Sequence, residues 1–102
     1  QFQNNAEVIT AWGEVLIAEG GDQALEEASQ QFNKLISGLT PDQDLFWNAW
    51  RRRLQINDKL GQHTDVIPRR VQQLKERYDR NLGGEPYRST LERLADKHRA
   101  GG

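Results

Sequence analysis

The apolar residues of this chain recur at intervals of three and four over nearly its whole length, and no segment alternates apolar and polar residues with a period of two. This spacing is typical of amphipathic helices, and Gly or Pro stands at the plausible boundaries between them. We therefore predict an all-α fold, a compact antiparallel bundle of four main helices plus a short C-terminal helix. Connections of two to five residues favour antiparallel neighbours.

The first two helices are expected on either side of Gly20-Gly21. The first spans about Asn5 to Glu19, with Asn4 or Asn5 as its N-cap. Its apolar stripe consists of Val8, Ile9, Trp12, Val15 and Leu16. The second spans Asp22 to about Ser37, and its spacing predicts one narrow buried seam. That seam consists of Leu25, Ala28, Phe32 and Leu35, with Ile36 and Leu39 beside it.

Three more helices are predicted in the rest of the chain. The third spans Pro41 to about Leu60, with Thr40 as a capping hydroxyl, Pro in the first turn and Gly61 as its terminator. The fourth spans about Asp65 to Leu82, and Gly83-Gly84 follows it. The last spans Pro86 to about Arg99.

The third helix is predicted to be the centre of the fold. Its apolar residues sweep an arc of about 200°, wider than one buried face requires, so it should contact several neighbours. They are Leu45, Phe46, Trp47, Ala49, Trp50, Leu54, Ile56 and Leu60. Arg53 and Asn57 fall inside this arc, and a buried guanidinium needs a carboxylate. We predict a buried ion pair between Glu19 and Arg53; the alternative is an Arg53 whose stem is buried and whose head is in water.

Charge is divided between the two halves of the chain. Residues 1–46 hold eight acidic residues and one basic residue, whereas residues 47–102 hold thirteen basic and seven acidic residues, in a chain of net charge −1. Either the halves neutralise each other within the fold, or the basic half binds an acidic partner through unpaired charge.

The fourth helix carries a basic surface that we call the arginine stripe. It consists of Arg69, Arg70, Gln73, Arg77 and Arg80. Such a stripe can dock on an acidic protein surface, can follow a phosphate backbone, or can be a solvated face neutralised by nearby acids. Trp47 and Arg51 are candidates to extend the binding surface, since Trp47 lies at the edge of the apolar arc, while Trp50 is expected in the core.

Catalysis, metal binding and cofactor binding have little support. Cysteine is absent, and His63 and His98 share no helix at metal-ligand spacing. No serine has the surroundings of a nucleophile elbow. We therefore predict no catalytic residue, no metal and no cofactor. No apolar run approaches the roughly 20 residues that cross a bilayer, so no membrane association and a soluble protein are expected.

These features favour a non-enzymatic helical module for protein–protein interaction, an adaptor or assembly unit. A first residue Gln1 and the absence of Met suggest a single domain excised from a longer protein, and absent cysteine leaves the compartment open. The alternatives are an accessory nucleic-acid-binding domain, and a sensor or small-ligand bundle with a polar cavity around Arg53 and Asn57. Self-association is also possible, because the first two helices form an acidic face. That face consists of Glu7, Glu14, Asp22, Glu26 and Glu27.

Overall fold

The computed structural model describes residues 2–99, and this part of the chain is mostly helical. The connections between helices have two to five residues except residues 78–86, which form a longer turn segment than expected. The elements are α1 (Phe2–Glu19), α2 (Asp22–Gly38), α3 (Asp44–Leu60), a 3-10 turn η1 (Thr64–Val66), α4 (Ile67–Arg77) and α5 (Tyr87–Lys97). The prediction of a compact all-α bundle with four main helices and a short C-terminal helix is confirmed.

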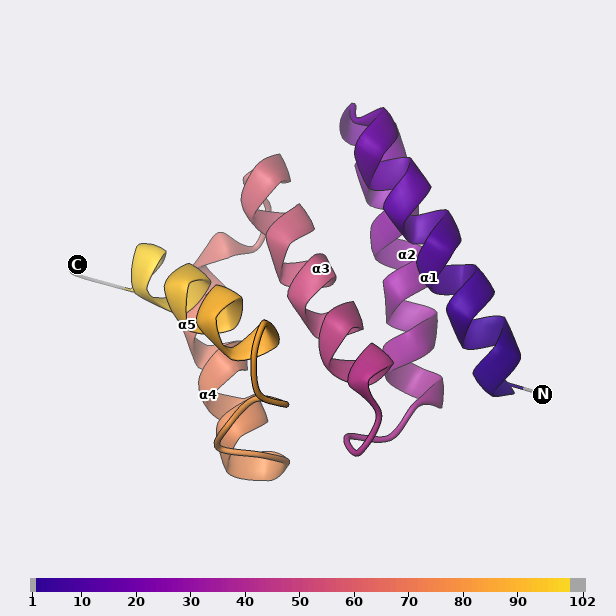
Figure 1. The fold of residues 1–102 in the computed structure, drawn as a ribbon. Coiled ribbons are helices and arrows are strands. Elements are labelled where there is room, and N and C mark those ends of the chain that lie inside the picture. The colour runs from indigo at the N-terminus through magenta and orange to yellow at the C-terminus, as the bar shows by residue number, and fades with distance from the viewer. Residues whose placement is uncertain (1, 100–102) are drawn as a thin grey trace.

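Helix α3 lies in the middle of the molecule (Figure 1). The antiparallel pair α1 and α2 lies on one side of it, and the pair α4 and α5 lies on the other. The bundle measures 42 × 32 × 20 Å, so it is broad and thin. Contacts of α3 with α1, α2 and α5 confirm that the central helix has several neighbours.

The core joins one face of each outer helix to a wide face of α3. The predicted seam of α2 is confirmed, because Leu25, Ala28, Phe32 and Leu35 are all buried. Helix α3 buries seven residues, which explains why its apolar arc is so wide. They are Phe46, Trp47, Asn48, Ala49, Trp50, Leu54 and Ile56.

Helix α1 packs on α2 through a face that only partly matches the predicted stripe: Leu16 is buried and Ile9 is partly buried against the core, as expected. Its buried residues include Ala6, Gly13 and Leu16. A Cβ added to Gly13 would lie 2.6 Å from the ring of Phe32, so the missing side chain lets the two helices approach closely. The predicted core residues Val8, Trp12 and Val15 are instead 68%, 47% and 53% exposed. The prediction is wrong for these three residues. Apolar residues surround α1, and the face that packs is the one on which Ala6 and Gly13 allow a close approach.

Three predicted helix boundaries also differ from the structure. Helix α1 begins at Phe2, so the asparagines lie within it and do not cap it. Helix α3 begins at Asp44 rather than in the Thr40-Pro41 segment, which forms a turn in which the Gln43 N–H donates to the Thr40 carbonyl over 3.0 Å. The carbonyl of Pro41 accepts a 2.7 Å hydrogen bond from Nε1 of Trp47, which fixes the turn against α3.

Helix α4 ends at Arg77, five residues before the predicted end at Leu82. Leu82 is fully buried but has a φ of 53°, in the left-handed region, so its apolar side chain reaches the core from a turn. The next residue, Gly83, has a φ of 81° and packs against Trp47. The helical spacing of apolar residues in the sequence extends to Leu82 although α4 does not. A continued helix and the observed turn would both place this side chain on the core side.

Candidate functional site

The arginine stripe lies on the side of α4 that faces away from the core. The buried face of α4 consists of Ile67, Val71 and Leu74, and Arg69, Gln73 and Arg77 are exposed on the other side. Arg70 is half-buried at the edge of the stripe. Arg80 is exposed in the turn after the helix, so it continues the stripe beyond α4 without belonging to the helix.

None of the four arginines of the stripe has a carboxylate within 4.0 Å among residues 2–99. The basic residue of α4 that does pair is Lys75, whose Nζ lies 3.2 Å from Oε2 of Glu92 on α5. Within the stripe, Nη1 of Arg70 donates to Oε1 of Gln73 over 3.2 Å. No described carboxylate of the acidic half therefore pairs directly with these arginines, which leaves their guanidinium groups without an ion-pair partner in the described part of the chain.

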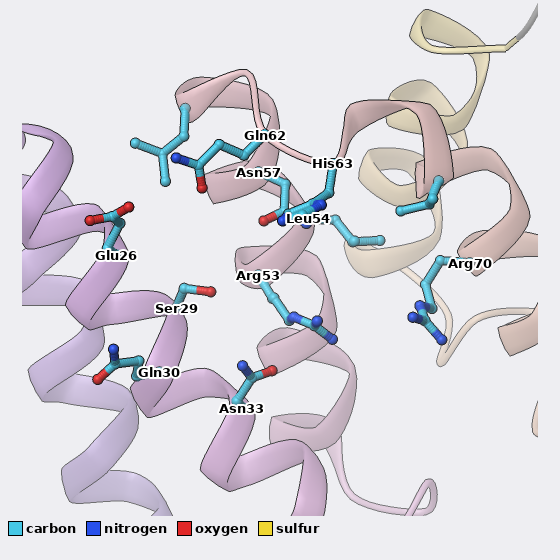
Figure 2. A pocket seen from close by; sticks show the side chains of 12 residues that line it. Glu26, Ser29, Gln30, Asn33, Arg53, Leu54, Asn57, Gln62, His63 and Arg70 are labelled. Carbon is cyan, nitrogen blue, oxygen red and sulfur yellow. The ribbon is translucent and has the colours of Figure 1, made fainter.

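Arg70 also lines a polar groove between α2, α3 and α4, which we call the α2–α4 groove (Figure 2). The guanidinium carbons of Arg53 and Arg70 lie 5.2 and 5.5 Å from the centre of the same indole ring, that of Trp50. Stacking on the ring orients both side chains. Burial, and then the neighbouring charge of Arg70, lower the pKa of Arg53.

The rest of the α2–α4 groove is lined mainly by uncharged polar side chains, and its volume is about 550 Å³. Ser29, Gln30 and Asn33 come from α2, Asn57 comes from α3, and Gln62 and His63 follow α3. Figure 2 shows Arg53 reaching from α3 toward the side on which Arg70 lies, with Ser29 and Asn33 on the opposite wall. Glu26 is the acidic residue among the lining residues, and it lies at the α2 wall.

Two like charges without a carboxylate beside them, surrounded by amide and hydroxyl donors, make this groove suited to an anionic group. A carboxylate or a phosphate in this groove would reduce the repulsion between Arg53 and Arg70. The sequence indicated this feature in part, because Arg53 and Asn57 interrupt the apolar arc of α3. It gave no sign that polar residues of α2 would face them.

The predicted ion pair between Glu19 and Arg53 does not form. Glu19 is exposed at the end of α1, and no carboxylate among the described residues lies within 4.0 Å of Arg53. The cause is the rotation of α3 about its axis. Arg52 faces α1 and pairs with Glu14 over 2.8 Å, whereas Arg53, the next residue, faces the α2–α4 groove. The acidic and basic halves do meet between α1 and α3, but through different residues.

The two residues that were expected to extend the binding surface are engaged within the fold. Trp47 is 2% exposed and contacts the ring of Phe46, so it is a core residue and is not available to a partner. Arg51 is half-buried, where its Nη2 donates to Oδ1 of Asn48 over 2.6 Å and its guanidinium lies over the ring of Tyr87 on α5. Trp50 is buried, as predicted.

No known protein family, no curated protein and no solved structure matches this chain. Within residues 2–99, no three His, Cys, Asp or Glu side chains lie together in a way that would hold a metal ion. The helices of the same region are too short or too polar to cross a membrane.

Proposed function

We propose that this bundle is a non-enzymatic protein–protein interaction module that binds an acidic surface of another protein through the arginine stripe. The observation that carries the proposal is the absence of carboxylate partners for Arg69, Arg70, Arg77 and Arg80 among residues 2–99. Four guanidinium groups in one surface attract and orient an acidic partner, because Arg binds carboxylates through two parallel hydrogen bonds.

The α2–α4 groove adds specificity to this docking surface. Arg70 belongs to both the stripe and the groove, so a partner lying along α4 can place one carboxylate in the groove that Arg53 and Arg70 line. Both guanidinium groups stack on the ring of Trp50 in the unbound protein, so a partner loses less free energy in ordering these two side chains on binding. The buried environment strengthens the interaction with an anion relative to a fully exposed arginine.

A nucleic acid would use the same surface differently, and one feature favours it: Tyr78 is exposed directly after Arg77 and could stack on a base. The charge of the whole chain weighs against it. A net charge of −1, with eight acidic residues in the first 46, repels a long phosphate backbone outside the stripe.

Fluorescence anisotropy with labelled probes tests the proposal. The probes are a Glu-rich peptide, a single-stranded oligonucleotide and a duplex, each titrated at about 50 and about 200 mM salt. The peptide is expected to bind at the lower salt concentration, and the double variant Arg69→Glu/Arg77→Glu is expected to weaken it by about tenfold or more. Lys34→Glu, which reverses an exposed base on α2, is the control and should bind normally.

Equal peptide binding by the stripe variant and the Lys34→Glu control would contradict the proposal. So would the absence of peptide binding at low salt. Much tighter binding of either oligonucleotide than of the peptide would replace the proposal with the nucleic-acid alternative.

A further inference from the structure

The outward side of α1 is an apolar surface that is exposed within residues 2–99. It consists of Val8, Ala11, Trp12 and Val15, and we call it the α1 ridge. These positions are spaced i, i+3, i+4 and i+7, the arrangement with which an amphipathic helix enters a groove. The opposite side of α1 is buried against α2, so the helix is apolar on two sides, which is typical of a helix that is covered on both.

The charges of α1 specify what can cover its ridge. The helix contains three charged residues, Glu7, Glu14 and Glu19, and no basic residue. Glu14 is already paired with Arg52 of α3, whereas Glu7 and Glu19 are exposed. A complementary surface is therefore concave, apolar at its base and basic at its rim.

The same chain contains such a surface between α3 and α5, with Ile17 of α1 at one wall, which we call the α3–α5 groove. Its volume is about 360 Å³ and its apolar lining includes Ile17, Ile56 and Leu94. Its basic lining residues are Arg52, Lys59, Arg93 and Lys97, and Asp58 is the acidic residue among the residues that line it. Lys59 and Arg93 are exposed, and neither has a carboxylate within 4.0 Å in the described part of the chain.

We propose that the α1 ridge of one copy docks in the α3–α5 groove of a second copy, with Trp12 as the anchor and Glu7 and Glu19 toward Lys59 and Arg93. Ridge and groove share no residue, so the contact joins two different surfaces and is head-to-tail. Two ridges paired with each other would instead bring together acidic residues alone. A dimer formed in this way keeps one free α1 ridge and one free α3–α5 groove, so further copies can bind at its two ends.

Sedimentation velocity over a range of concentrations tests this contact with two complementary variants. Trp12→Gln removes the anchor of the ridge and keeps the groove, whereas Lys59→Glu/Arg93→Glu reverses the groove and keeps the ridge. The wild-type protein should form larger species as concentration rises, and each variant alone should weaken association by about thirtyfold or more, as expected for a tryptophan anchor or reversed charges. All the altered residues are exposed, and circular dichroism checks that both variants remain folded.

The decisive measurement is the mixture of the two variants. One intact ridge and one intact groove remain in it, so the mixture should form a 1:1 complex and nothing larger. Lys34→Glu is the charge control and should associate like the wild type. A wild-type protein that stays monomeric at about millimolar concentration, a groove variant that associates as before, or a mixture that stays monomeric would each overturn the proposal.

Discussion

Arg52 and Glu14 join the two oppositely charged halves of the chain, with Nε of Arg52 donating to Oε2 of Glu14 over 2.8 Å between α3 and α1. The side chains are 28% and 36% exposed, so water reaches both partners. Arg52 is further held by Gln55, whose Oε1 accepts from Nη1 over 3.0 Å. The division of charge along the sequence is thus bridged in the fold by a partly hydrated contact rather than by a buried ion pair.

A double-mutant cycle on this contact should therefore give a small coupling energy. We expect Arg52→Ala and Glu14→Ala to be coupled by about 0.2 to 1 kcal/mol, because partly exposed pairs are screened and their side chains lose entropy. The free energy of unfolding in urea measures each variant. A coupling of about 3 kcal/mol or more would mean that the pair behaves as a buried one.

Gly83 is expected to be among the positions least tolerant of substitution. Its φ is 81°, and an added Cβ would lie 2.3 Å from Cγ of Trp47. Gly83→Ala therefore combines backbone strain with overpacking of the core, at a cost of about 2 to 5 kcal/mol in the free energy of unfolding.

The neighbouring glycine provides the control for that substitution. Gly84 has nearly the same φ, 82°, but the nearest atom to an added Cβ is 3.8 Å away. Gly84→Ala should show the backbone strain alone, about 1 to 2 kcal/mol. Equal losses for the two variants in urea denaturation would show that contact with Trp47 does not contribute.

Asp58 is predicted to make stability depend on pH in the acid range. A hydrogen bond from Lys97 lowers the pKa of the Asp58 carboxyl, burial opposes it, and the contact with His98 lowers it further. Because the pKa in the folded state lies below the unfolded value of about 3.9, the stabilisation is fully present above that pH and is lost as pH falls through the folded-state pKa.

Urea midpoints at about pH 5 and about pH 2 measure this effect. The wild-type protein should lose more stability between the two than Asp58→Asn, which has no carboxyl at this position. The control is Asp96→Asn, which removes an exposed ion pair with Arg99. This variant should lose as much stability between the two pH values as the wild type, because Asp58 is intact. The explanation fails if Asp58→Asn and the wild type lose the same amount.

Small polyvalent anions should stabilise the protein through the α2–α4 groove. Pyrophosphate binding between Arg53 and Arg70 would raise the melting temperature in proportion to the logarithm of its concentration. Arg53→Gln is expected to remove most of this increase. Arg88→Gln, at a partly exposed arginine paired with Glu85, should retain this increase. Equal increases in the two variants would show that pyrophosphate acts elsewhere or through ionic strength.

The sequence predicted best the helices whose apolar residues occupy a single stripe. Helix α2 is the clear case, because Leu25, Phe32 and Leu35 allow one buried face. Helix α1 is the opposite case. Its apolar residues surround the helix, so periodicity could not choose a face, and the choice depended on the space that Gly13 leaves for Phe32.

The candidate site was predictable in its charges but not in its geometry. The arginines of α4 follow from helical spacing, whereas the burial of Trp47 depends on a long-range contact with Gly83. The rotation of α3 that turns Arg52 toward Glu14 and Arg53 toward Arg70 is set by packing against α1, α2 and α5 together. Spacing within one helix carries no information on which neighbour each side chain will meet.

The three tryptophans give the protein a natural pair of optical signals. Trp47 and Trp50 lie in the core, whereas Trp12 on α1 is 47% exposed to solvent. Acrylamide or iodide should quench the emission of Trp12 selectively while the protein is folded. Loss of that quenching would report coverage of α1, and a red shift of the remaining emission would report unfolding, so one unlabelled sample distinguishes the two events.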